Sequence, residues 1–248
     1  MQLDWPVLAT VALIFTFAGW IKGVIGLGLP TIATGLLGLF MAPVQAASIV
    51  VLPAILTNIC QMLIGPGFLM MLRRLWPMLA AVVVGTVASA GVVARADVRF
   101  TVAALGAALI AYSLHALYGT KLRVPPHWEG SIGAAAGLAN GIISGTTGVF
   151  VVPTVPFLQA LELDKDEMVQ AIGITAFTSA FALALGLGVH GALRTEAAWP
   201  AATAVAAAFA GMALGQVVRS GLSVETFRRW VLIGLACLGA TMLSRGLL

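Results

Sequence analysis

The stretch GWIKGVIGLGLP, Gly19–Pro30, holds four glycines, one proline and one lysine inside a long apolar run. Glycine loses backbone entropy in a helix, while proline removes a hydrogen-bond donor and clashes with the preceding turn. The stretch is therefore predicted to break a helix. Lys22 lies well inside the apolar run, where a cation is costly and usually marks a functional site with an anion or a carbonyl as its partner.

The composition is that of a polytopic membrane protein. The chain has 248 residues, of which 60% are hydrophobic and only 9% are charged, and its mean hydropathy is +1.06. Soluble domains carry about 25% charged residues. The thirteen Lys and Arg residues are scattered between apolar runs, which argues against a nucleic-acid partner. Cys60 and Cys237 lie in apolar runs, so we expect buried thiols and neither a metal site nor a disulfide.

Two of the eight apolar segments are too long to cross a bilayer once. The segments are 6–42, 46–66, 75–94, 99–119, 131–161, 168–190, 198–218 and 226–246. As one straight helix, 6–42 would be about 55 Å long, against a hydrocarbon core of about 30 Å. Both 6–42 and 131–161 contain a glycine cluster near the middle. Each is either a strongly tilted broken helix or a helical hairpin.

The chain also repeats itself. The pair Trp76–Pro77 recurs as Trp199–Pro200, each opening an apolar segment, and GWIKG at 19–23 matches GLANG at 137–141. Residues 1–120 and 131–248 are thus predicted to be two copies of one transmembrane repeat, joined by a loop at 121–130. Internal duplication is typical of secondary transporters, which bind substrate where the halves meet.

The distribution of basic residues favours hairpins. If every segment crosses once, each side receives six basic residues, whereas with two hairpins the split becomes eight against four, a usable positive-inside bias. Hairpins also place matching loops of the two halves on opposite faces. We therefore predict an all-α polytopic membrane protein of two inverted four-segment repeats, the first segment of each being a glycine-broken helical hairpin, with both termini outside.

The two breaks are the first candidate binding site. Broken helices expose backbone N–H groups that favour anions, and such backbone is tolerated in lipid only where protein or a cavity covers it. The candidates are Lys22, Gly23, Gly26 and Gly28 in the first half, and Asn140, Gly141, Ser144 and Gly145 in the second. Alternatively, the G-x-x-x-G patterns are helix-packing faces, and Lys22 extends to an interface.

A second candidate feature is a polar cluster in the following segment. Thr57, Asn58 and Gln61 share one helical face, and Asn58 is the strongest candidate because a buried amide needs several partners. The counterparts in the second half are Thr175, Thr178 and Ser179. The alternative is hydrogen bonding between helices, worth about 1 kcal/mol per contact.

Nearly the whole chain resembles the sulfite exporter TauE/SafE family of membrane permeases. The resemblance rests on FAGWIKGVIGLGLP, on QAASIVVLPAILTNICQ, on the WP pair and on a weaker second copy, GLANGIISGTTGVFVVP. It implies transport of sulfite or related organosulfonates across a bacterial inner membrane, with the substrate between the two glycine-rich hairpins. It points to Lys22, Gly23, Gly26 and Gly28, to Asn58 and Gln61, and to Asn140, Gly141, Ser144 and Gly145. In the second copy Ser144 replaces a glycine and Gly148 replaces the proline.

The leading hypothesis is a secondary transporter for a small oxyanion, working by alternating access and without a cofactor, since no G-x-x-x-x-G-K-[ST] motif occurs. Its expected partners are the anion, the lipid bilayer and a second copy in a homodimer. One alternative is an intramembrane serine hydrolase using Ser144 and His190, because a serine nucleophile needs a base within reach. Another is a membrane subunit without transport activity.

Overall fold

The computed structural model describes residues 5–65, 67–95, 97–119, 123–193, 197–219, 221 and 223–247, and every regular element within them is helical. The helices are α1 (Trp5–Ile25), α2 (Leu29–Leu37), α3 (Pro43–Met62), α4 (Phe68–Arg95), α5 (Val98–Tyr118), η1 (Pro126–Trp128), α6 (Glu129–Thr147), α7 (Thr154–Gln159), α8 (Lys165–Val189), α9 (Ala198–Arg219) and α10 (Val224–Leu247).

The helices match the predicted segments closely. Among the described residues, seven helices are long and apolar enough to cross a membrane: α1, α3, α4, α5, α8, α9 and α10. Each of the two overlong segments is divided into a long and a short helix, α1 with α2 and α6 with α7. The loop predicted at 121–130 falls partly on 120–122, outside the described residues, and its last part forms η1 and the start of α6.

The third predicted segment was wrong at its beginning. We expected it to open at the Trp76–Pro77 pair, but α4 begins at Phe68 and contains Pro77 in its interior. The helix carries Arg74 within its first two turns, where the guanidinium holds the Glu129 carboxylate at 2.7 Å and 3.0 Å. This charge-assisted pair gives Arg74 a partner near the end of the bundle, so α4 can include Arg74 and begin before it. Trp199–Pro200 does open α9 as expected.

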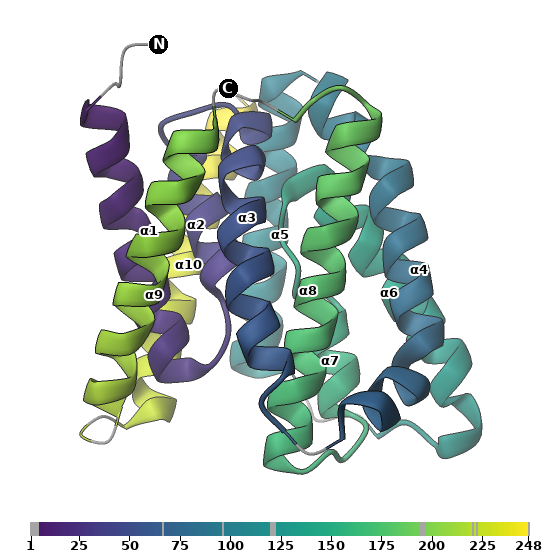
Figure 1. The fold of residues 1–248 in the computed structure, drawn as a ribbon. Coiled ribbons are helices and arrows are strands. Elements are labelled where there is room, and N and C mark those ends of the chain that lie inside the picture. The colour runs from purple at the N-terminus through teal and green to yellow at the C-terminus, as the bar shows by residue number, and fades with distance from the viewer. Residues whose placement is uncertain are drawn as a thin grey trace.

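The bundle is built from helix pairs that join the first half of the chain to the second. Helix α1 packs along α9, α4 along α6, α3 along α8, and α5 along α10. Figure 1 shows the beginning of α1 and the end of α10 at the same end of the bundle. The core lies between these pairs and includes Phe15, Leu29 and Phe150, all of which are nearly inaccessible.

Glycines allow the backbones of these pairs to touch. A Cβ at Gly19 would meet the carbonyl of Ala208 on α9, and one at Gly137 would meet the carbonyl of Met78 on α4. Small residues at such contacts are typical of helix association in lipid, where close packing replaces the hydrophobic effect. Gly19 and Gly137 are therefore helix-packing positions, as the alternative interpretation of the G-x-x-x-G patterns predicted.

The two cysteines do not lie in the core. Cys60 and Cys237 are exposed on the described structure, which corrects the expectation that both are buried. Many large apolar side chains on the same outer surface are also exposed, among them Leu13, Trp230 and Val217. In a bilayer this surface faces acyl chains, which are as apolar as a protein core, so an apolar sequence context does not distinguish lipid from core.

The α5–α10 contact provides a test of this packing. A Cβ at Gly106 would lie 2.6 Å from the carbonyl oxygen of Gly239 and 2.6 Å from the amide nitrogen of Leu243, so both backbones would have to separate. We expect Gly106→Ala to destabilise the protein by about 1–3 kcal/mol, measured as a lowered thermal midpoint in detergent. Gly234→Ala on the same pair is the control, because a Cβ there meets nothing within 4 Å. Equal midpoints for the two variants would contradict the close α5–α10 packing.

Candidate functional site

The first helix break is formed by glycines in the left-handed region. Helix α1 closes with a hydrogen bond from the Gly26 amide to the Lys22 carbonyl at 2.7 Å. Gly26 has φ +89° and Gly28 has φ +102°, backbone conformations that residues with a Cβ rarely adopt. Gly28 is the N-cap of α2, and Pro30 occupies its first turn, where the missing donor costs nothing. The predicted break is thus located at residues 26–28.

Lys22 is buried at the end of α1 and points toward α3. Its side chain is 3% exposed, and its Nζ donates to the Asn58 Oδ1 at 2.6 Å and to the Thr57 Oγ1 at 3.1 Å. No carboxylate of the described residues pairs with it. An ammonium group has three donors, and two are accounted for by these neutral oxygens. The polar face predicted on α3 is therefore the binding partner of the predicted lysine.

Asn58 leaves a donor free beside this ammonium group. Its Oδ1 accepts from Lys22, whereas its Nδ2 is buried and has no hydrogen-bond partner in the described structure. A buried unpaired amide N–H costs about 1–3 kcal/mol. Lys22 and Asn58 together thus present unfilled N–H donors at one position in the protein interior, and an anion is the ligand that such donors prefer.

Gln61 ties the break to both halves of the chain. Its Nε2 donates to the Gly26 carbonyl at 3.0 Å and to the Val169 carbonyl on α8 at 3.2 Å. A reciprocal contact comes from Gln170, whose Nε2 donates to the Met62 carbonyl at 3.0 Å and to the Gly65 carbonyl at 3.2 Å. These two amides join α3 to α8 directly beside the break.

Gln170 was missed by the sequence analysis. It is fully buried on α8, and its Oε1 has no partner among the described residues. The hydroxyl cluster predicted in that segment does not include it, and two members of that cluster, Thr175 and Thr178, donate to carbonyls of their own helix. A glutamine one turn inside an apolar segment was the available indication.

The second break is organised by Asn140. In the orientation that satisfies its whole amide, Nδ2 donates to the carbonyls of Phe150 at 3.2 Å and Val152 at 3.0 Å, and Oδ1 accepts from Ser179 Oγ at 3.2 Å. Gly148, with φ +74°, caps α6 and begins the non-helical segment before α7. Asn140 therefore pairs the freed carbonyls of this segment and connects it to α8.

The other predicted residues of the second half face a different neighbour. Gly141 and Gly145 pack against the backbone of α4, and Ser144 Oγ lies 2.9 Å from Thr86 Oγ1 on that helix. In the first half Gly23 likewise packs on α9, close to Gly215. The predicted site residues thus separate into three groups, because successive positions on a helix point in different directions: Gly23, Gly141, Ser144 and Gly145 pack against a neighbouring helix and form the first. Lys22, Gly26, Asn58 and Gln61 are connected by hydrogen bonds, whereas Asn140 forms its own group.

The two breaks approach each other in the core. Thr34 Oγ1 on α2 donates to the Gly148 carbonyl at 3.5 Å, and Val149 and Phe150 share a hydrophobic cluster with Leu29. Thr31, also on α2, carries a buried hydroxyl oxygen without a partner in the described structure. The short helix α2 therefore connects the break that carries Lys22 to the one that carries Asn140.

The geometry does not support a serine nucleophile. Ser144 Oγ contacts Thr86 Oγ1 and donates to the Gly141 carbonyl at 3.1 Å, while His190 Nδ1 lies 2.7 Å from the Gly186 carbonyl at the end of α8. Each side chain is engaged with other groups, and no contact between them occurs. A hydroxyl without a base in reach is a poor nucleophile.

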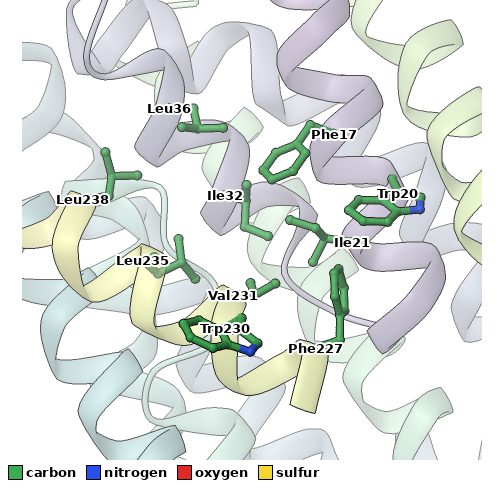
Figure 2. Close-up of a pocket in the computed structure, with 11 residues that line it drawn as sticks. Phe17, Trp20, Ile21, Ile32, Leu36, Phe227, Trp230, Val231, Leu235 and Leu238 are labelled. Carbon is green, nitrogen blue, oxygen red and sulfur yellow. The ribbon is translucent and has the colours of Figure 1, made fainter. Parts of the chain in front are cut away.

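A groove between α1, α2 and α10 is unsuited to an anion. Its volume is about 370 Å³, and Figure 2 shows apolar side chains of all three helices turned toward it. Trp20 and Phe227 meet edge to face at its rim, with ring centroids 5.0 Å apart. Among the described residues, the lining has no charged side chain, and its only side-chain donors are the indole N–H groups of Trp20 and Trp230, so an ion would lose its hydration there for little in return and the groove is a poor anion site.

Comparison with known proteins identifies a family. The family model described as sulfite exporter TauE/SafE matches residues 11–242. No curated protein and no solved structure matches the chain. The matched range covers both breaks, all of the hydrogen-bonded groups described above and all but the ends of the bundle.

The bridge formed by the two hydrogen bonds that Gln61 donates, to Gly26 and to Val169, provides a test of the site. Gln61→Leu removes the donor that pairs the Gly26 and Val169 carbonyls, and an unpaired buried carbonyl costs about 1–3 kcal/mol. We expect a lower thermal midpoint in detergent and faster proteolysis at the break. Gln45→Leu is the matched control, since the same change is made at an exposed position of α3. If Gln61→Leu were as stable as Gln45→Leu, the bridge would not hold the break.

Proposed function

Because the chain belongs to the sulfite exporter TauE/SafE family, a family of transporters and not of enzymes, we propose that it moves a small sulfur-containing oxyanion across a bacterial inner membrane. Sulfite and organosulfonates are the proposed substrates. One observation carries the proposal: Lys22 is buried in the bundle with only neutral oxygen partners among the described residues. A membrane-embedded cation without a counter-ion is most simply explained by an anion that comes and goes.

The proposed anion site is centred on Lys22 and Asn58. Sulfite accepts hydrogen bonds at three oxygens, which suits the remaining N–H of Lys22 and the unpartnered Nδ2 of Asn58. The exposed backbone at Gly26 and Gly28 lies at the adjacent break, and Gln61 positions that break. Asn140 contributes from the second half by shaping the facing segment. Close packing of the broken helices is made possible by Gly23, Gly141 and Gly145, and Ser144 contributes its contact with Thr86 on α4.

We also propose that the two halves, 1–120 and 131–248 with the loop 121–130 between them, are inverted repeats that begin with helical hairpins. Exchanging the halves turns the α1–α9 pair into the α6–α4 pair, which supports an internal two-fold relation. Left-handed glycines at both breaks, and a short helix after each, support paired hairpins over tilted broken helices. Rocking of one half against the other would then expose the site to each side in turn.

The orientation follows from the basic residues. Figure 1 shows the ends of α3 and α9 and the starts of α4, α8 and α10 at the end of the bundle opposite the start of α1. That end carries Arg73, Arg74, Arg123, Lys165, Arg219, Arg228 and Arg229 of the described residues. Lys121 and Arg194, which also entered the predicted count, lie outside the described residues. By the positive-inside rule this end is cytoplasmic and both termini are periplasmic.

Lys22→Met tests the transport proposal. Methionine matches the length of the lysine stem but carries no charge, so we expect at least a tenfold loss of uptake from a protein that still folds in detergent. The measurement is uptake of sulfite, thiosulfate, sulfonates and carboxylates into proteoliposomes. Lys165→Met is the control, because it removes an exposed lysine at the start of α8. Uptake by Lys22→Met equal to that of the wild type would refute an anion site at Lys22, whereas no uptake by either protein would favour a non-transporting membrane subunit.

Reporter fusions test the orientation. A reporter active only in the periplasm is expected to be active when fused after Leu247 and inactive when inserted at residue 221, between α9 and α10. The opposite pattern would reverse the orientation. Cross-linking in membranes tests the proposed homodimer, for which we expect a covalent species of twice the monomer mass.

A further inference from the structure

A second cavity, about 710 Å³ in volume, lies at the basic end of the bundle. Its walls are the last turn of α5, the short helix α7, the start of α8 and the start of α10, so both halves of the chain contribute. Unlike the groove in Figure 2, it has a polar lining. The polar and charged side chains at its walls are His115, Arg123, Gln159, Glu162 and Arg228.

The charges of this lining do not cancel. Arg123 Nε pairs with Glu162 Oε1 at 2.9 Å, and both side chains are largely exposed, so that pair is close to neutral as a unit. Arg228 is half-buried, and no carboxylate of the described residues pairs with it. The cavity therefore holds one guanidinium group, that of Arg228, with no direct ion-pair partner in the described structure, and His115 as a further polar group.

We propose that this cavity is a cytoplasmic vestibule that binds a small oxyanion, with Arg228 as its principal ligand. A guanidinium group presents paired N–H donors that match two oxygens of an oxyanion, and it stays charged at all physiological pH values. A concave wall of low dielectric concentrates the field of such a charge. The identity of the solute rests on the proposed function, whereas the phosphate of a lipid headgroup offers the same chemistry from another source.

The position of the vestibule suits a step on the way to Lys22. Met168 lines the cavity and precedes Val169, whose carbonyl accepts the hydrogen bond from Gln61. Gln61 in turn holds the Gly26 carbonyl at the first break. One wall of the vestibule is therefore adjacent in the chain to the bridge that holds the first break, and the anion would reach Lys22 when that bridge opens.

Transport by a matched pair of variants tests this role. Arg228→Gln and Arg229→Gln remove the same charge from neighbouring positions of α10, but only Arg228 lines the cavity. In phosphatidylcholine proteoliposomes we expect Arg228→Gln to raise the sulfite concentration for half-maximal uptake at least fivefold, with the maximal rate within twofold of wild type. Arg229→Gln is expected to stay within twofold in both. Equal effects of the two variants would reduce Arg228 to a general surface charge and overturn the inference.

Direct binding separates the vestibule from the proposed transport site. We expect Lys22→Met in phosphatidylcholine nanodiscs to bind sulfite calorimetrically, and the added Arg228→Gln change to weaken that binding at least fivefold. Arg228→Lys, which keeps a charge, is expected to retain part of it and guards against misfolding of the glutamine variant. If Lys22→Met binds no sulfite, the proposal that the vestibule binds an oxyanion is wrong. The proposed transport function is tested separately, by uptake of sulfite by the wild type.

A second nanodisc composition tests whether the anion bound by Arg228 is the phosphate of a lipid headgroup. If Arg228 binds a headgroup phosphate, native mass spectrometry of phosphatidylglycerol nanodiscs will show lipid retained by the wild type and lost from Arg228→Gln, with no Arg228-dependent sulfite binding in phosphatidylcholine. That pattern would overturn the solute vestibule. Arg228-dependent binding of sulfite in phosphatidylcholine, without selective lipid retention, supports it.

Discussion

The structure depends on pairing the backbone groups that are freed where its helices break inside the membrane. Lipid offers no hydrogen bonds, so every such group must find a partner in the protein. Side-chain amides do this in both halves: Gln61 holds the Gly26 carbonyl, and Asn140 holds the carbonyls of Phe150 and Val152. Both amides also contact α8, Gln61 through the Val169 carbonyl and Asn140 through Ser179. The two breaks are thereby joined to one helix at the centre of the bundle.

Some buried amides pair backbone carbonyls, and others keep polar atoms without a partner. The amides of Gln61 and Asn140 are occupied by backbone carbonyls, whereas Asn58 has an unpartnered Nδ2 beside the Lys22 ammonium group. Lys22 and Asn58 are bonded to each other, so removing either leaves the other with an unpaired polar group. The two breaks therefore differ in chemistry: the first carries a charge, and the second carries neutral groups that complete the backbone pairing.

Close helix packing sets the geometry on which these contacts depend. Gly19 and Gly23 bring α1 against α9, and Gly137 and Gly141 bring α6 against α4, so that each broken helix is supported along its length by a helix of the other half. The glycine clusters consequently have two roles. Some glycines make the backbone turn, as Gly26, Gly28 and Gly148 do, and others let backbones touch. Both are consequences of a missing Cβ, and the sequence pattern is the same for each.

The sequence by itself determined the membrane class, the family, the two breaks and the helical segments apart from the start of the third. Hydropathy and the positions of glycine, proline and Lys22 are local properties of the chain and can be read from it directly. It also placed Thr57, Asn58 and Gln61 on one helix face, since residues three or four apart share a face. That Lys22 donates to Asn58 and Thr57 of this face was seen only in the structure. Three features were decided only in three dimensions: the direction of Gly141, Ser144 and Gly145 toward α4, the surface exposure of Cys60, and the hydrogen bonds that Gln170 makes to the end of α3. The physical reason is that lipid and protein interior are equally apolar, so which side of a membrane helix faces a partner depends on neighbours distant in the chain.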